Sequence, residues 1–251
     1  MDHETIIAVQ DLAVEYKTRS GKLRAVDGVS FQVRRGECVG FIGPNGAGKS
    51  STITALMGFH FPARGWIRIF GEPAGTVASK LRIGYLPEVT LYYPFLRGTE
   101  LLKLYGGLQR VPASVLQERI PRLLETVGLT GYGNRLIRNY SKGMQQRLGI
   151  AQALIAEPEC LIFDELSSGL DPVGRHDLRA VLLDLKSRGV TIFFSSHELY
   201  EVEALCDRVI AIHKGRVLFD QMLGDLLEAA GAAGLEAYFM SLVRRQDSSA
   251  S

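Results

Sequence analysis

The chain has 251 residues, which is enough for one large α/β domain or two small ones with a sizeable buried core. Its hydrophobic content of 46% and charged content of 22% are typical of globular proteins, and a net charge of +2 leaves no electrostatic footprint for nucleic acid. Asp2 and Glu4 begin the chain without a signal-like apolar region, and no uninterrupted run approaches about 18 apolar residues. We therefore expect a chain that does not itself span a membrane.

Two segments near the N-terminus alternate apolar and polar residues. Residues 12–16 and 29–33 carry apolar side chains at every second position, which predicts two half-buried strands with a polar turn at 18–22 between them. Ile67 and Ile69 continue the same pattern further along. Together these segments predict a small antiparallel sheet beside the stretch that follows.

That stretch, residues 43–50, reads Gly-Pro-Asn-Gly-Ala-Gly-Lys-Ser. An apolar run at 38–42 leads into it and a predicted helix at 51–57 leads out, so the context is strand, loop, helix. The spacing matches G-x-x-x-x-G-K-[ST], in which backbone N–H groups and a helix N-terminus surround phosphate oxygens. Lys49 would reach the β- and γ-phosphates, and the hydroxyl of Ser50 would ligate a magnesium ion. The predicted nucleotide contacts here are Gly43, Pro44, Asn45, Gly46, Ala47, Gly48, Lys49, Ser50 and Ser51.

The remaining chain alternates strand-like and helical patterns. Residues 81–86 predict a strand that Pro87 stops, and residues 98–155 show apolar spacing near 3.6, which predicts a helical insertion. Apolar runs at 160–163, 190–194 and 209–212 then predict the strands of a buried parallel sheet, for the reason that only strands covered on both faces are so apolar. An apolar helical face at 235–243 follows a flexible segment at 229–234, and we expect residues 246–251 to be disordered.

The three cysteines, Cys38, Cys160 and Cys206, stand singly in apolar segments, outside the spacings of metal ligands. We interpret them as reduced core residues of a cytoplasmic protein.

Polar side chains follow two of the predicted strands. Asp164 and Glu165 come directly after the run at 160–163, at the carboxyl edge where open α/β sheets bind ligands. Asp164 is suited to a magnesium shell and Glu165 to activating an attacking water as general base, although acidic residues after a strand are also common as solvated loop starts. His197 follows the strand at 190–194 on the same edge, and is predicted to hydrogen-bond the γ-phosphate.

The segment Tyr140-Ser141-Lys142-Gly143-Met144-Gln145-Gln146-Arg147 resembles the LSGGQ signature of the ATP-binding cassette (ABC) ATPases, and the resemblance extends over nearly the whole chain. In that family the signature lies at a helix N-terminus and binds the γ-phosphate held by the opposite subunit, so that two cassettes enclose two ATP molecules head to tail. The resemblance implies that Ser141 supplies a hydroxyl and Gly143 a close backbone approach.

Other positions follow the family pattern one by one. Tyr16 matches the aromatic residue that stacks on adenine, although it also fits a residue of the sheet core. Residues 162–165 resemble the Walker B strand with its catalytic glutamate, and His197 matches the switch histidine. Asp171 would face the partner's phosphate loop from the dimer-contacting loop, Ser168-Gly169-Leu170-Asp171. Glu88 occupies the loop that senses both magnesium and the membrane partner. The resemblance thus implies Lys49, Glu165 and His197 as catalytic residues, and Ser50, Glu88 and Asp164 around the metal.

Three departures from the family pattern are present. The commoner residue at Glu88 is Gln, so a carboxylate would lie near the metal and could retune hydrolysis. Lys142 and Met144 replace the first glycine and the glutamine of the signature. Leu166-Ser167 stands where Pro-Thr is usual, which we interpret as neutral.

The predicted fold is α/β: a P-loop NTPase (RecA-like) core, with an N-terminal antiparallel β subdomain and an inserted α-helical subdomain that carries the signature. We expect one ATPase domain at 1–220, with its core at 1–90 and 156–220 and the insertion at about 91–155. A C-terminal helical extension at 221–245 and the tail at 246–251 would follow.

The resemblance implies an ATPase that uses ATP and Mg²⁺ at the cytoplasmic face of a membrane, as a peripheral subunit. Its implied partners are a separate transmembrane permease and a second cassette, either a second copy or a close relative. Four residues, Tyr92, Tyr93, Phe95 and Leu96, fit the rim of a cleft for the permease, and fit packing of the insertion equally well. Residues 85–88 read Tyr-Leu-Pro-Glu, and the ending at 235–243 resembles the Leu-Glu-x-x-Phe close of exporter cassettes for drugs, lipids or polysaccharides. This resemblance favours export over import.

Two alternatives come from other classes. A soluble mechanical ATPase acting on nucleic acid or ribosomes usually has two cassettes, a long coiled-coil insertion or basic tails, which this sequence lacks. A kinase or GTP-binding switch would share the phosphate loop but would not explain residues 141–147 or His197.

Overall fold

The computed structural model describes residues 4–19, 21–165 and 170–249, and its strands form two sheets. The smaller sheet is antiparallel, and its order β2-β1-β4-β5 confirms the predicted N-terminal sheet. Its two long strands pair directly, and the predicted polar turn is shorter than expected because pairing continues to Thr18 and Gly21. Its strands are β1 (Thr5–Thr18), β2 (Gly21–Arg34), β4 (Arg64–Ile69) and β5 (Glu72–Pro73).

The larger sheet has the order β10-β9-β3-β8-β7-β6, and every pair from β9 to β6 is parallel. The predicted buried strands are all present. The strand predicted at 81–86 begins later than expected, because residues 81 and 82 precede it. The antiparallel edge strand β10 was not predicted. The strands are β3 (Cys38–Ile42), β6 (Ile83–Leu86), β7 (Cys160–Phe163), β8 (Thr191–Ser196), β9 (Arg208–His213) and β10 (Arg216–Met222).

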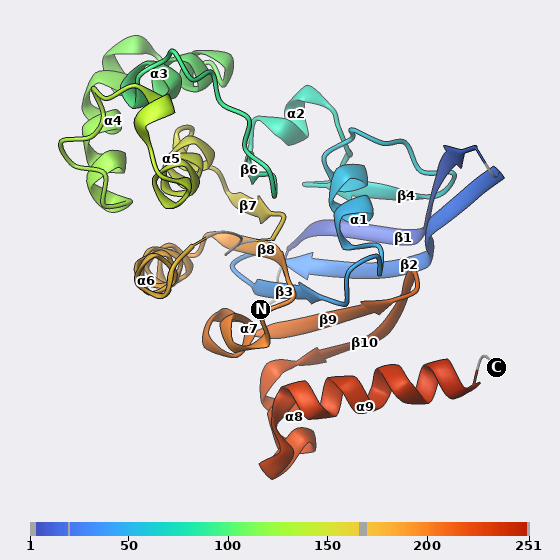
Figure 1. Cartoon of the computed structure of the whole chain (residues 1–251). Coiled ribbons are helices and arrows are strands. Elements are labelled where there is room, and N and C mark those ends of the chain that lie inside the picture. The colour runs from blue at the N-terminus through green and yellow to red at the C-terminus, as the bar shows by residue number, and fades with distance from the viewer. Residues whose placement is uncertain (1–3, 20, 166–169, 250–251) are drawn as a thin grey trace.

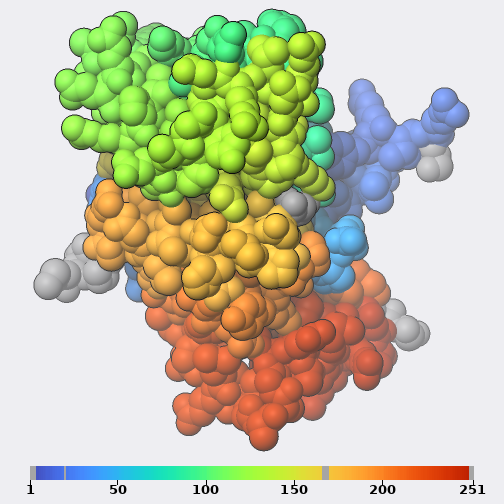
Figure 2. Space-filling model, turned by 60° about the vertical axis from the view of Figure 1, so that its left-hand side comes forward, coloured from blue at the N-terminus to red at the C-terminus, as the bar shows by residue number. Residues whose placement is uncertain are grey.

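Helices cover the larger sheet and form a lobe at one end of the molecule. Figure 1 shows the inserted helices together at the top, and in Figure 2 they form the green and yellow upper end. The lobe contains α3 (Gly98–Leu108), α4 (Ala113–Thr126), the 3₁₀ turn η1 (Ile137–Asn139) and α5 (Lys142–Leu154). The other helices up to β9 are α1 (Lys49–Leu56), α2 (Val77–Lys80), α6 (Pro172–Ser187) and α7 (Leu199–Leu205).

The buried apolar side chains form two clusters on the two faces of the larger sheet. One lies between the two sheets around α1, where the rings of Phe31, Phe41 and Phe193 have centroids 5.5 to 5.8 Å apart. The other joins the opposite face to the inserted helices, α6 and the C-terminal helices. Cys38, Cys160 and Cys206 lie in these cores as buried free thiols, and burial raises the pKa of Cys160 to about 12.

The C-terminal segment contains α8 (Leu223–Ala230), the turn η2 (Gly231–Ala233) and α9 (Gly234–Ser249). The expected disorder at 246–251 is wrong for residues 246–249, which continue α9, and residues 250 and 251 lie outside the described chain. Contacts of Asp247 with His213 and Lys214, at 2.8 and 2.7 Å, hold this end of the helix against the core.

Among the described residues, one stretch, Leu223–Ser248, has the length and apolar composition of a membrane-crossing helix. Gly231 and Gly234 have positive φ angles and divide it into two helices. Leu226, Leu235 and Phe239 are buried in the core, so its apolar face packs on the domain.

Candidate nucleotide-binding site

The loop between β3 and α1 wraps tightly around the start of α1. Gly48 stands at the N-cap with φ at 111°, and a Cβ there would come within 2.6 Å of the carbonyl oxygen of Ala25. Only glycine fits this conformation and this space. Because no side chain caps α1, the N–H groups of its first turn remain available to an anion.

A cavity of about 480 Å³ opens beside this loop. It gathers residues that lie more than 180 positions apart in the sequence, from both sheets and several loops. Its lining is Tyr16, Leu23, Ala25, Asn45, Gly46, Gly48, Lys49, Ser50, Ser51, Glu88, Glu165 and His197. Two other predicted residues of the loop, Gly43 and Pro44, instead line the neighbouring cavity next to α9. Ala47, also in the loop, is buried.

Lys49 is buried at the floor of this cavity. Its ammonium group donates to the carbonyl oxygen of Gly43 at 2.7 Å and lies 3.3 Å from Oε1 of Glu165. A buried cation needs such partners, and a bound anion can replace the carboxylate among them.

Glu165 is held between Lys49 and His197. Nδ1 of His197 lies 2.6 Å from Oε2 of Glu165, so each carboxylate oxygen has one basic partner. The histidine ring is 56% exposed while the glutamate is almost fully buried. The contact between Glu165 and His197 therefore extends from the buried part of the site to its solvent-exposed opening.

Ser195 links the two acidic residues from the adjacent strand. Its hydroxyl donates to Oδ1 of Asp164 at 2.8 Å and accepts from the N–H of Glu165 at 2.8 Å. The hydroxyl of Ser50 also donates to Asp164, at 3.2 Å. Burial raises the pKa of Asp164 above its ordinary value, these two hydrogen bonds oppose the rise, and the charge of Glu88 adds to it.

The far side of the cavity is formed by the β1–β2 hairpin. The hydroxyl of Tyr16 donates to Ser51 at 3.3 Å, and its ring lies 4.7 Å from the ring of His60 at 38°. His60 itself contacts the backbone oxygen of Glu15 at 3.1 Å. One side of Tyr16 is thereby supported, and Tyr16 also lines the cavity.

Ser141, Gly143 and Asp171 do not line this cavity. Ser141 is exposed and caps α5 by accepting the N–H of Met144 at 3.2 Å, and Asp171 caps α6 by accepting the N–H of Gly174 at 2.7 Å. A Cβ at Gly143 would meet nothing closer than 3.8 Å, so the fold of this chain does not require a glycine there. The segment 166–169, with Ser168 and Gly169 of the predicted dimer-contacting loop and the Leu166-Ser167 departure, lies outside the described residues.

Sequence reasoning missed four residues of the site: Leu23 and Ala25, which line the cavity, and Ser195 and His60, which contact other site residues. Ser195 is the second residue from the end of β8, which pairs with β7. Because residues at the carboxyl ends of neighbouring parallel strands meet, this position could have indicated its contact with the acidic residues. His60 had no such signal, since only the folded turn after α1 brings it to Tyr16.

The parallel sheet, the strand–loop–helix and the paired carboxylates at the strand ends define a P-loop nucleotide-binding fold. The sequence matches the ABC transporter family over residues 26–168. An uncharacterised ABC transporter ATP-binding protein of Nostoc sp. strain PCC 7120 is 43% identical over 228 residues, 89% of this chain and 68% of that protein. The Nod factor export ATP-binding protein I of Ralstonia nicotianae is 37% identical over 213 residues, 84% of this chain and 65% of that protein.

The chain thus spans about two thirds of the length of these curated relatives. A solved ATP-binding subunit of an ABC transporter superposes with a TM-score of 0.85 at 32% identity, over 94% of this chain and 99% of that one. This chain belongs to the ABC transporter family, as an ATP-binding cassette with ATPase activity.

Proposed function

We propose that this chain is the ATPase subunit of an exporter and works on a separate transmembrane permease at the cytoplasmic face of the membrane. The observation that carries the proposal is the contact of Lys49, Glu165 and His197 in one cavity beside the phosphate loop. A cation that can bind phosphate and a carboxylate held by a histidine are groups that can bind ATP and activate the attacking water.

The site residues then divide the tasks of binding and hydrolysis. The loop N–H groups and Lys49 bind the phosphates, and the phosphates replace Glu165 as the ionic partner of the Lys49 ammonium group. The freed carboxylate of Glu165 accepts a proton from the attacking water, while His197 orients the carboxylate and hydrogen-bonds the γ-phosphate. Tyr16, supported by His60, stacks on the adenine.

The residues also fit a magnesium ion. The hydroxyl of Ser50 and the carboxylate of Asp164 lie together, Glu88 adds a carboxylate at the cavity wall, and all of these donors are oxygen. Mg²⁺ suits such a set because it is usually held by one or two carboxylates together with phosphates and water. When bound, the ion neutralises phosphate charge during hydrolysis.

A second cassette completes the site in this proposal. Ser141, Gly143 and Asp171 lie outside the cavity of their own chain, and the smallness of Gly143 is not needed for its own packing. Both observations support binding of a partner's nucleotide at the start of α5.

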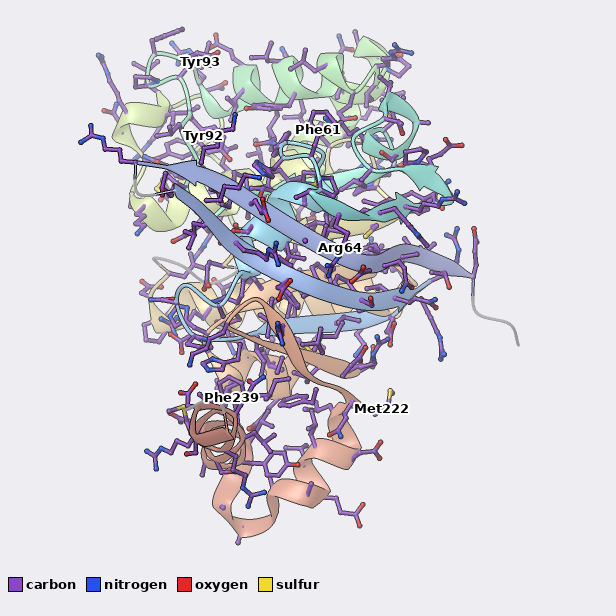
Figure 3. The ribbon with its side chains drawn as sticks, turned by 90° about the vertical axis from the view of Figure 1, so that its right-hand side faces the viewer. Phe61, Arg64, Tyr92, Tyr93, Met222 and Phe239 are labelled. Carbon is purple, nitrogen blue, oxygen red and sulfur yellow. The ribbon has the colours of Figure 1, made fainter. Side chains whose placement is uncertain are left out.

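The permease would bind exposed apolar side chains near the inserted helices. Phe61 is 84% exposed and Leu91 is 89% exposed, and Tyr93 and Phe95 also face solvent. Figure 3 shows Phe61 and Tyr93 toward the same end of the molecule, away from Met222 and Phe239. Tyr92 instead packs against the lobe and donates to Gln152 at 3.2 Å, which suits a floor residue. Such an apolar surface suits a short helix from the partner.

Export is supported by the relative named for Nod factor export. No observation favours the alternative of a soluble ATPase acting on nucleic acid, and the net charge of +2 offers that ligand little attraction.

The proposal is tested with Lys49→Ala. We expect Mg-ATP binding to fall by at least about a hundredfold, since a buried charge-assisted contact to phosphate is lost. The wild-type chain, tagged in its host and solubilised with ATP, should retain a polytopic membrane protein at stoichiometric level. Unchanged affinity in Lys49→Ala, or recovery only with ribosomal or nucleic-acid companions, would refute the proposal.

A further inference from the structure

The β1–β2 hairpin carries one side of the nucleotide cavity on one face and a chain of ion pairs on the other. Tyr16 and Leu23 are cross-strand partners and both line the cavity. Their neighbours Glu15 and Arg24 are also partners, and successive residues of a strand point to opposite faces. The charged pair therefore lies directly behind the two cavity residues.

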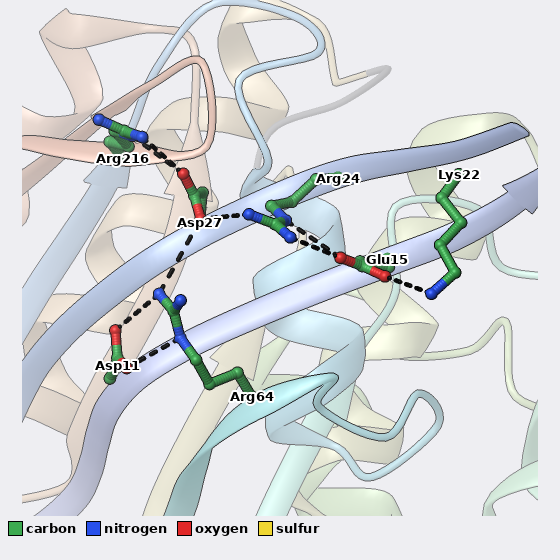
Figure 4. Close-up of polar contacts among 7 residues, drawn as sticks. All are labelled: Asp11, Glu15, Lys22, Arg24, Asp27, Arg64 and Arg216. Atoms are coloured by element: carbon green, nitrogen blue, oxygen red, sulfur yellow. Dashed lines mark hydrogen bonds and ion pairs between the residues drawn. The ribbon is translucent and has the colours of Figure 1, made fainter.

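Asp27 is the centre of this chain of ion pairs. Its carboxylate lies 2.7 Å from Arg216 of β10, 3.2 Å from Arg24 of its own strand and 4.0 Å from Arg64 of β4. Figure 4 shows the three guanidinium groups converging on it. Arg24 also forms an ion pair with Glu15, at 2.9 Å between nitrogen and oxygen. One carboxylate thus joins the smaller sheet to the edge strand of the larger sheet.

The backbone of Asp27 continues the connection to the phosphate loop. Its N–H donates to the carbonyl oxygen of Gly215, in the turn between β9 and β10, at 2.8 Å. The N–H of Gly215 donates in turn to the carbonyl oxygen of Ala47 at 2.8 Å. The hairpin and the phosphate loop are therefore both attached to this turn.

We propose that Asp27 is a positioning residue for ATP, which fixes the hairpin face of Tyr16 and Leu23 at its working distance from the phosphate loop. The inference rests on the proposed ATP site and adds a residue that does not itself touch the nucleotide. It predicts that loss of the Asp27 charge weakens contacts to the adenine side and spares contacts to the phosphates.

The electrostatics explain why this one carboxylate matters. The hydrogen bond from Arg216 holds the pKa of Asp27 below its ordinary value, so the group is ionised at neutral pH. Without its charge, the ion pair with Arg216 is lost, and the hairpin loses this side-chain link to β10. These arginines do not form an anion site, because each already pairs with a carboxylate: Arg24 with Glu15, Arg64 with Asp11 and Arg216 with Asp27.

The experiment measures binding of Mg-ATP and of Mg-tripolyphosphate to Asp27→Asn by isothermal titration calorimetry. Tripolyphosphate has the phosphates without the base, so it reports on the loop alone. We expect ATP to bind about threefold to tenfold more weakly, and tripolyphosphate to stay within about twofold of wild type. Arg216→Gln should behave in the same way, and Asp27→Glu should recover most of the ATP affinity.

Asp11→Asn is the matched control. It removes another carboxylate of the same cluster, 2.9 Å from Arg64, but one without a bond to β10 or to the phosphate loop. Its ATP affinity should equal that of wild type. Equal weakening of both ligands in Asp27→Asn, or no weakening of either, would overturn the positioning role. Failure of wild type to bind ATP, or normal binding by Lys49→Ala, would instead refute the proposed function.

Discussion

At the scale of single residues, Glu165 shows how the fold prepares one side chain. Its φ is 54°, in the left-handed region that costs a non-glycine residue about 1 kcal/mol. The N–H bond to Ser195 and the contacts to Lys49 and His197 hold it there. This conformation turns the carboxylate from the end of β7 into the cavity.

Glu165→Gln tests the role of that carboxylate. We expect ATP binding to persist while hydrolysis falls by about a hundredfold or more, because an amide cannot accept the proton of the attacking water. Single-turnover hydrolysis measures the effect, and gel filtration with ATP should reveal a trapped dimer. Glu198→Gln is the control, because Glu198 pairs with Arg175 at 3.0 Å. This variant should hydrolyse ATP at the wild-type rate. Wild-type turnover by Glu165→Gln would assign the base elsewhere.

At the scale of elements, α9 is a folded part of the domain. Phe239 is buried and makes an edge-on contact with the ring of Phe219 on β10, at 6.4 Å between centroids. The next residue, Met240, is 42% exposed. Phe239 therefore lies on the buried face of α9, and Met240 lies on its exposed face.

Phe239→Ala should lower the free energy of unfolding by about 3 kcal/mol, because it removes a buried ring and leaves a cavity. Urea denaturation measures this difference. Met240→Ala, on the exposed face, should lie within about 0.5 kcal/mol of wild type. A loss of no more than about 0.5 kcal/mol in Phe239→Ala would contradict the contribution of this buried face to the stability of the domain.

At the scale of the whole molecule, one chain holds two separate halves of the proposed chemistry. The cavity contains Lys49 and Glu165, whereas Ser141 lies outside it at the start of α5. In the proposed head-to-tail pair, the second half of one copy would meet the cavity of the other.

Mixing Ser141→Arg with Lys49→Ala tests that arrangement. Each variant alone should be inactive, because both of its composite sites contain a defect. An equimolar mixture with random pairing should recover about a quarter of wild-type ATPase, since half of the dimers are mixed and each has one intact site. No recovery, despite mixed dimers confirmed by mass spectrometry, would contradict the composite site.

The sequence by itself determined the phosphate loop, the strands that lead to it and the acidic residues at the end of β7. These features depend on local spacing: Gly48 is required by its own φ angle, and the run Cys160–Phe163 is apolar because both of its faces are covered. Tertiary structure decided the rest. The edge strand β10, the helical end of α9 and the contacts of Ser195 and His60 arise from packing between distant segments, which no local pattern encodes. The same is true of Asp27, whose partner Arg216 is 189 residues away and reaches it only because the two sheets meet beside the phosphate loop.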